Sequence, residues 1–189
     1  MGRLSMPRPI PVLAGEIVTL RPINPALDAP DYCRMNLDPE MHTWTGNDVL
    51  PSIEAARAEL ERFAAMDDVT TWAVVDNASD EMAGRFFITL EERDRLLISG
   101  EGNRIAKRFW RKGHNRDARR LIFRYVFTVL GADVIESEAW SQNVNSIESL
   151  KAHGFSFVSE ETAYNPKHAR AMVKRHFRMT RQQWLDLHG

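Results

Sequence analysis

The sequence has one cysteine and no long hydrophobic run. Cys33 stands alone among 189 residues, which excludes an internal disulfide, a cysteine zinc site and a CxxC redox pair. No segment approaches the roughly 18 consecutive apolar residues of a membrane helix. Residues 1–15 lack the apolar run of a secretory signal and contain three prolines. We therefore expect a cytoplasmic protein with no membrane partner and a flexible N-terminal arm over residues 1–13.

An excess of charge is absent as well. The 25 Lys and Arg residues nearly balance the 26 Asp and Glu residues, for a net charge of −1. Such a balance gives no global attraction to nucleic acids or to a membrane surface. With 43% hydrophobic and 27% charged residues, the composition is that of a soluble globular protein, and the length suits one domain over residues 14–189. Electrostatic recognition must therefore be local.

The first half of the chain predicts one strand, two helices and an antiparallel meander. Alternation over Glu16–Arg21 predicts the strand. A short helix follows, beginning near Leu27 or Pro30, and a second over residues 52–66 has Ser52 as its N-cap. Three apolar runs separated by turn-forming or charged residues then predict the meander, over residues 70–76, 82–92 and 95–106.

Helices and strands alternate in the second half. From Gly113 to Gly131 the apolar residues repeat at helical spacing. A second helix has Asn145 and Glu148 at capping-box spacing. Strands are predicted over residues 133–140, 155–161 and 170–180. The order is mixed α and β, with antiparallel strands first and crossover helices later.

Positive charge gathers in one stretch, Arg104–Val126, which holds nine Lys or Arg residues and one acid. Within it, a strand ending near Ala106 precedes Gly113, which begins a helix. The free amides of a helix N-terminus at the end of a sheet bind phosphate groups without a metal. Five basic residues near that N-terminus add to the positive potential: Lys107, Arg108, Arg111, Lys112 and Arg116. The three that follow are expected on the solvated face of the helix, namely Arg119, Arg120 and Arg124.

The segment "GNRIAKRFWRKGHNRDA" resembles the strand-loop-helix signature of the Gcn5-related N-acetyltransferases. "WRKGHN", Trp110–Asn115, stands where the family has a six-residue Q/R-x-x-G-x-G/A loop around the pyrophosphate of acetyl-coenzyme A. A Trp at the first position, here Trp110, also occurs in the branch of ribosomal-protein alanine acetyltransferases. Asn115, by contrast, departs from the usual Gly or Ala. Asn tolerates left-handed backbone angles, which preserves the loop conformation.

A second motif of that family follows in register. "NVNSIESLKAHGF" matches the pattern N-x-x-S followed by Gly-Phe, here Asn143, Ser146, Gly154 and Phe155. The ends "GEIVTLRPI" and "RHFRMTRQQWLDL" are similar to the alanine acetyltransferase branch. The resemblance thus extends from about Ala14 to Leu187.

The resemblance implies an α+β fold and an enzymatic activity. The fold would be a central, mostly antiparallel mixed sheet of about seven strands, splayed at the cofactor site and flanked by about four helices. The enzyme would use acetyl-CoA and no metal. It would transfer acetyl directly from the thioester to a primary amine, on a protein N-terminus or a small molecule.

The same resemblance assigns roles to the two motifs. The backbone of one strand segment would pair with the pantetheine arm: Asn103, Arg104, Ile105 and Ala106. The amides of the loop and the first helical turn would hold the pyrophosphate: Arg111, Lys112, Gly113, His114, Asn115 and Arg116. Asn143 would hydrogen-bond the pantetheine or orient the thioester, and the Ser146 hydroxyl would protonate the departing thiolate. For both of these residues, helix capping is the alternative.

Glu101 is the acid best placed in sequence to act as a general base. Many relatives have the acid one residue earlier, where this chain has Gly100. Because side chains alternate along a strand, Glu101 would lie on the opposite face unless a bulge intervenes. His114 is a possible titrating group but is expected only to line the phosphate loop.

Acceptor recognition is expected from the helices over residues 26–66 and the loop near Tyr164–Lys167. Residues 26–68 hold ten acids and three basic residues, which suits a cationic amine. Three aromatic residues could line the acceptor pocket, with core packing as their alternative role: Trp44, Trp72 and Tyr164. We expect a monomer or a homodimer.

Two other functions remain open. A relative that binds CoA without catalysis would account for Asn115 and the displaced acid. An RNA- or ribosome-associated module would use the basic helix face, but such modules usually add exposed stacking aromatics, so no nucleic acid partner is expected.

Overall fold

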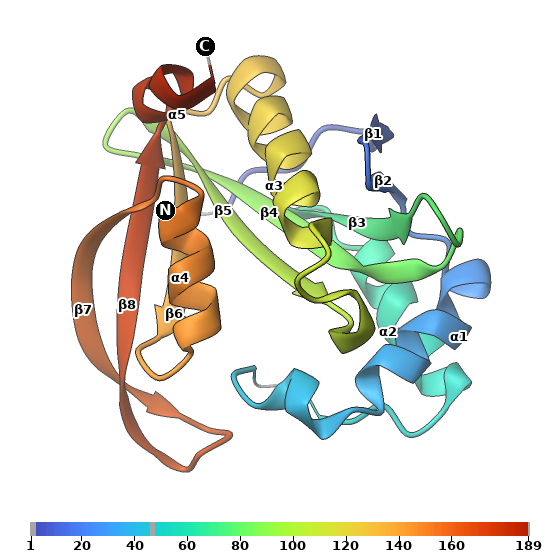
Figure 1. The fold of residues 1–189 in the computed structure, drawn as a ribbon. Coiled ribbons are helices and arrows are strands. Elements are labelled where there is room, and N and C mark those ends of the chain that lie inside the picture. The colour runs from blue at the N-terminus through green and yellow to red at the C-terminus, as the bar shows by residue number, and fades with distance from the viewer. Residues whose placement is uncertain (1–2, 46–47, 189) are drawn as a thin grey trace.

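The computed structural model describes residues 3–45 and 48–188. Eight strands form one mixed, mostly antiparallel sheet in the order β1-β2-β3-β4-β5-β6-β8-β7 (Figure 1). The strands are β1 (Leu13–Ala14), β2 (Val18–Pro22), β3 (Val69–Asp76), β4 (Met82–Arg93), β5 (Leu96–Ile105), β6 (Val134–Trp140), β7 (Ser156–Asn165) and β8 (Arg170–Thr180). The predicted meander is confirmed as β3, β4 and β5, which pair antiparallel.

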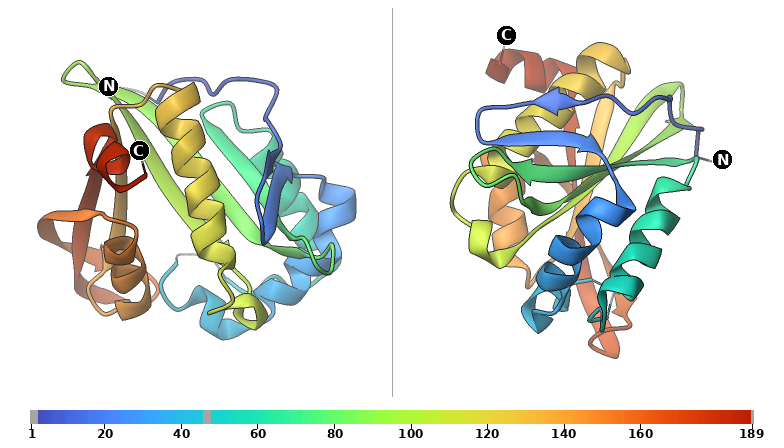
Figure 2. Two further views of the ribbon diagram at one scale, coloured as in Figure 1. Left: turned by 45° about the horizontal axis from the view of Figure 1, so that its top comes forward. Right: turned by 90° about the vertical axis from the view of Figure 1, so that its right-hand side faces the viewer.

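Helices cover both faces of the sheet (Figure 2). The α-helices are α1 (Pro25–Asn36), α2 (Ile53–Ala64), α3 (His114–Arg124), α4 (Val144–Ala152) and α5 (Arg181–His188). Two short 3-10 helices, η1 (Pro39–His42) and η2 (Lys107–Phe109), and a π-helical continuation of α3, η3 (Tyr125–Val129), complete the described elements. Arg85 of β4 contacts Tyr32 of α1, whereas Trp72 of β3 meets Tyr125 at the end of α3. Helices α1 and α2 therefore lie on one face, and α3 on the other.

The predicted α+β fold is confirmed, with corrections to its elements. One strand and one helix more than expected are present, because residues 13–14 pair with β2 and "RQQWLDLH" forms α5. Ser52 caps α2 as predicted, since its Oγ accepts from the N–H of Ala55 at 3.2 Å. Asn145 is not a cap: α4 already includes Val144, and Asn143 is the N-cap residue.

The N-terminal arm is packed rather than loose over its described part. The Leu4 N–H donates to the carbonyl of Leu90, and the Met6 N–H to that of Asp67, both at 2.7 Å. Met6 is buried in the core. These contacts fasten the arm to the sheet, while residues 1–2 of the predicted arm lie outside the described residues. Within residues 3–45 and 48–188, no helix is long and apolar enough to cross a membrane.

Strands β5 and β6 form a parallel pair that is short. The ladder joins Ile98 to Val134, Ser99 to Ile135 and Gly100 to Glu136, and then stops. Beyond Gly100, β5 pairs only with β4, and beyond Glu136, β6 pairs only with β8. The two strands therefore diverge, as Figure 1 shows, and the sheet is splayed from Gly100 onward.

Candidate active site

The "WRKGHN" loop connects the end of β5 to α3 at the open end of the splay. Gly113 is the N-cap of α3 and has φ 87°, a left-handed conformation that favours glycine. The indole N–H of Trp110 donates to the carbonyl of Ile105 at 2.6 Å, which fastens the loop to the strand. The first amides of α3 have no intrahelical partner by geometry, so they are available to an anion.

The basic side chains beside these amides point to solvent. Arg111, Lys112 and Arg116 are exposed. A phosphate at the helix N-terminus would therefore meet both amide dipoles and exposed cationic side chains. The residues present fit the pyrophosphate of a CoA thioester.

His114 does not line the loop with its side chain. The ring is buried, its Nε2 lies 2.7 Å from Oδ1 of Asp76, and Phe109 packs against it with ring centroids 4.8 Å apart. Oδ2 of Asp76 accepts from both the N–H and the hydroxyl of Ser79. Burial raises the pKa of Asp76, but the bonds from Ser79 and His114 outweigh it and hold that pKa below its ordinary value. The imidazole thus anchors the loop to the end of β3.

Asn115 and Arg119 turn toward α4. The Asn115 amide and the Arg119 guanidinium both donate to the hydroxyl of Ser149, at 3.2 and 2.9 Å. Asn115, the departure from the family loop, therefore ties α3 to α4 with its side chain. The prediction of a solvated face was wrong for Arg119, which is buried because it reaches across to Glu101; Arg120 and Arg124 are exposed as expected.

Glu101 is held at the apex of the splay. The β4–β5 register runs without a bulge through Gly100 and Glu101, so their side-chain directions oppose. The Glu101 carboxylate is almost fully buried, and its Oε1 accepts from Arg119 at 2.8 Å and from the Ser137 hydroxyl at 2.7 Å. Glu101 and Ser137 each directly follow the last ladder pair, Gly100 and Glu136. This pairing favours a role in holding the strands over proton abstraction.

The second motif lies at the start of α4. Oδ1 of Asn143 accepts from the N–H of Ser146 at 3.3 Å, which is the capping geometry. The Ser146 hydroxyl, by contrast, makes no hydrogen bond to any described residue, and the side chain is partly exposed. Capping therefore occupies the amide of Ser146 and leaves its hydroxyl available to a ligand.

The three aromatic residues predicted to line the acceptor pocket lie in different surroundings. Trp72 is completely buried and donates from Nε1 to the carbonyl of Pro11 at 2.8 Å, so its expected contact with an acceptor is not supported. Tyr164 is 67% exposed on β7. Trp44 packs on His168 with ring centroids 5.4 Å apart. The segment after η1 and the β7–β8 hairpin, both expected to bind the acceptor, thus lie side by side.

Two arginines on the α1–α2 face were not predicted to have side-chain roles. Arg85 and Arg104 are direct partners in the β4–β5 register and are both buried. Arg104 was expected to contribute only its backbone. The available signal was Arg85 itself, a charge inside the apolar run "MAGRFFITL".

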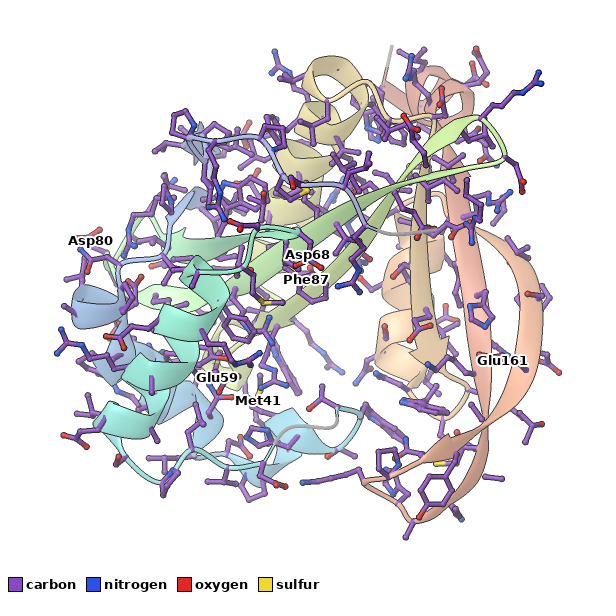
Figure 3. All side chains as sticks on the ribbon, turned by 180° about the vertical axis from the view of Figure 1, so that it is seen from behind. Met41, Glu59, Asp68, Asp80, Phe87 and Glu161 are labelled. Atoms are coloured by element: carbon purple, nitrogen blue, oxygen red, sulfur yellow. The ribbon has the colours of Figure 1, made fainter. Side chains whose placement is uncertain are left out.

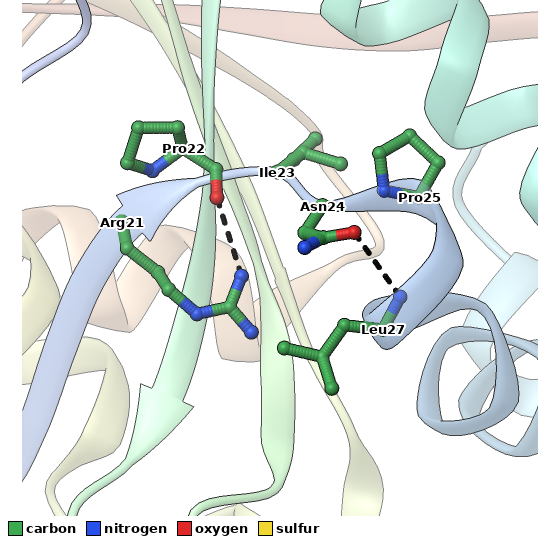
Figure 4. A pocket seen from close by; sticks show the side chains of 6 residues that line it. All are labelled: Arg21, Pro22, Ile23, Asn24, Pro25 and Leu27. Carbon is green, nitrogen blue, oxygen red and sulfur yellow. Dashed lines mark hydrogen bonds between the residues drawn. The ribbon is translucent and has the colours of Figure 1, made fainter.

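Two hollows are lined by none of the predicted site residues. One, of about 440 Å³, is formed by Arg21–Pro25 and Leu27, where the Arg21 guanidinium turns to the carbonyl of Pro22 at 3.2 Å and the Asn24 side chain caps α1 (Figure 4). The other, of about 600 Å³, lies between α4 and the β7–β8 ribbon. No group of three metal-ligating side chains occurs in the part of the chain that the structure describes.

A family model described as the acetyltransferase (GNAT) domain matches residues 18–156. The chain belongs to the GNAT acetyltransferase family. The resemblance found in the two sequence motifs is therefore confirmed, and acetyl-CoA-dependent acetyl transfer is the general activity of this family. Comparison with curated proteins gives no match.

Solved GNAT structures share the fold along nearly the whole chain. A GCN5-related N-acetyltransferase from Brucella melitensis superposes with a TM-score of 0.84 at 22% identity, covering 98% of this chain and 84% of that one. The ribosomal-protein-S5-alanine acetyltransferase of Vibrio fischeri gives 0.77 at 16% identity, covering 93% and 99%. Mycobacterium smegmatis RimJ, in complex with CoA-disulfide, gives 0.76 at 18% identity, covering 94% and 93%. At these identities, the likeness shows a common fold.

Proposed function

We propose that this GNAT protein is an N-acetyltransferase that moves acetyl from acetyl-CoA to a primary amine, on a protein N-terminus or a small molecule. The observation that carries the proposal is the end of the β5–β6 ladder at Gly100 and Glu136, with the N-terminus of α3 at the open end. The divergence leaves one edge of β5 unpaired over residues 101–105. An extended ligand can add to such an edge through backbone hydrogen bonds.

Binding of the cosubstrate is assigned to backbone groups. The amides of residues 111–116 would hold the pyrophosphate, and the free edge of β5 over residues 101–105, which includes Asn103, would hold the pantetheine arm. Acetyl-CoA supplies the activated thioester. The His114–Asp76 and Asn115–Ser149 contacts hold the loop and α3 in position.

Proton transfer is assigned to Ser146 and to solvent. The unpartnered hydroxyl of Ser146 would protonate the thiolate as it leaves, while Asn143 fixes the first turn of α4. Glu101 was the candidate base, but its pairing with Arg119 and Ser137 favours positioning. The amine would then lose its proton to water.

A direct test is release of free CoA thiol from acetyl-CoA in the presence of a panel of amines and peptides, with mass detection of the acetylated product. Amine-dependent thiol release supports the proposal. Binding of CoA without transfer to any amine would mark a protein that binds the cosubstrate only. Absence of CoA binding would remove the proposal altogether.

A further inference from the structure

Arg85 and Arg104 form a buried cationic pair on the α1–α2 face of the sheet. Their direct pairing in the β4–β5 register places both side chains on the same face, and their residues are 8% and 7% exposed. Arg104 donates to Oδ1 of Asn36 at 2.7 Å and to the hydroxyl of Thr45 at 2.9 Å. Arg85 donates from Nε to the hydroxyl of Tyr32 at 3.1 Å.

All of these partners are neutral. Neither guanidinium has a carboxylate within 4.0 Å among residues 3–45 and 48–188. Burial, followed by repulsion from Arg85, lowers the pKa of Arg104. A buried guanidinium normally has an acidic partner, because an uncompensated buried charge is costly. The pair therefore lacks the counter-charge that a purely structural role requires.

The other ionisable groups nearby leave at least one positive charge in excess. Glu59 of α2 is the carboxylate of this cluster; it accepts from the Tyr32 hydroxyl at 3.4 Å and lies 3.8 Å from the exposed Arg62. Figure 3 shows Glu59 and Phe87 on this side of the sheet. His42 is buried with Nε2 against the carbonyl of Asn36. Because Glu59 also pairs with Arg62, the two buried guanidinium groups keep at least one unneutralised positive charge.

The free groups of Arg85 are open to a ligand. Its guanidinium carbon lies 4.3 Å from the ring centroid of Phe63. Its two terminal nitrogens have no partner among the described residues, and neither is among the described polar atoms that are sealed from solvent without a partner. The planar pair of unpartnered N–H groups on Arg85 matches the two oxygens of a carboxylate.

The pair lies on the face that α1 and α2 cover, and the sequence predicts acceptor recognition by these two helices. Gly100, Gly102 and Arg104 share one face of β5, because side chains alternate along the strand. Helices α3 and α4 cover the other face through Arg119 and Ser149. From Gly100, where the ladder ends, to Arg104 is four residues, or on the order of 13 Å at a strand rise of about 3.3 Å per residue.

We propose that Arg85 and Arg104 bind a carboxylate of the acceptor, so that the acceptor is a primary amine with a carboxylate on the order of 10 Å away. A carboxylate supplies the negative charge that the pair lacks and can accept from both free nitrogens of Arg85. A peptide N-terminus with an acidic residue at its third position has this length. The assignment rests on the proposed N-acetyltransferase function.

The test compares two acceptors that differ only in this charge: Ala-Ala-Asp-amide and Ala-Ala-Asn-amide. Wild-type enzyme should acetylate the Asp peptide with kcat/KM about tenfold higher or more, mainly through a lower KM. Arg85→Gln should reduce this ratio to about 2 or less. Arg95→Gln, which removes an exposed charge at the turn of the same hairpin, should leave the ratio unchanged. A linear ω-amino acid of similar length and its amide repeat the comparison for small acceptors.

The outcomes separate this proposal from the proposed function. Equal kcat/KM for both members of each pair in active wild-type enzyme would overturn the carboxylate site and leave the acetyltransferase intact. If no amine is acetylated, thermal unfolding with the Asp or the Asn peptide still tests the site. Protection by the Asp peptide alone, lost in Arg85→Gln, supports it, and equal protection refutes it. The wild-type comparisons need no variant and hold even if Arg85→Gln fails to fold.

Discussion

Nε2 of His114, the first residue of α3, lies 2.7 Å from Oδ1 of Asp76, the last residue of β3. The contact joins the loop that we propose to bind the pyrophosphate to an element 38 residues earlier in the chain. Because the pair is buried and Asp76 is also held by Ser79, the position of the loop depends on the sheet rather than on the loop alone.

His114→Ala should weaken CoA binding about tenfold and lower the free energy of unfolding by about 1–3 kcal/mol, because the buried Asp76 loses a partner. Calorimetric titration with CoA and chemical unfolding measure the two effects. His188→Ala, at the exposed end of α5, is the control. Unchanged CoA affinity in a folded His114→Ala protein would show that the contact does not position the loop.

Gly113→Ala should lower both the free energy of unfolding and the affinity for CoA. The residue has φ 87°, and an added Cβ would lie 2.6 Å from Cδ1 of Ile17. Gly131, with φ 73° and open space around its Cβ position, provides a matched control. Both substitutions should destabilise by about 1 kcal/mol through backbone strain, but only Gly113→Ala should raise the Kd for CoA. Equal effects on Kd would remove Gly113 from the binding site.

Ser146→Ala should affect mainly kcat, whereas Asn143→Ala should affect mainly stability. The amide of Ser146, not its hydroxyl, completes the cap, so Ser146→Ala should change stability by less than about 0.5 kcal/mol. Its kcat should fall at least about tenfold if the hydroxyl is an acid. Asn143→Ala should lose about 1 kcal/mol of stability with the cap. Unaltered kcat in Ser146→Ala would mean that another donor, such as water, protonates the thiolate.

Glu101→Gln should destabilise the fold by about 3 kcal/mol, because it leaves Arg119 buried without its counter-ion. Glu101→Gln with Arg119→Met should recover part of that loss. The pH dependence of kcat/KM separates the two roles: a positioning residue leaves the profile unshifted. Disappearance of the acidic limb in Glu101→Gln would instead identify a base.

Asp117 should make the fold sensitive to acid. Burial raises the pKa of its carboxyl, but bonds from the Ile17 N–H, Arg120 and the Val18 N–H outweigh burial and lower it. The linked stability is therefore present above the ordinary value of 3.8 and is lost as the pH falls below it. Asp117→Asn should lower the free energy of unfolding by about 1–2 kcal/mol near neutral pH, and the difference from wild type should shrink in acid. A difference that stays constant with pH would contradict the linkage.

The sequence predicted most of the fold because local signals agreed with the final packing. Ser52 caps α2, the meander pairs as expected, and Gly113 begins α3 with a left-handed backbone angle. The loop and the second motif also predicted the family. These features depend on short-range patterns and on spacing along the chain.

The contacts made between distant elements could not be predicted. Charge alone placed Arg119 on the surface, but the splay of β5 from β6 creates a buried site for its ion pair with Glu101. Trp72 occupies the core since its register turns it toward Tyr125. The pairing of Arg85 with Arg104 appears only once β4 and β5 are in register.

Acetyl transfer to an amine is tested most directly by a stopped assay of CoA thiol release from acetyl-CoA, run with and without an amine and followed by mass analysis of the acceptor. We expect thiol release that requires the amine, an acceptor heavier by one acetyl group, and loss of the signal in Gly113→Glu, which places bulk and negative charge at the proposed phosphate site. A wild-type protein that binds CoA yet acetylates no amine or peptide in the panel would contradict the proposed N-acetyltransferase function.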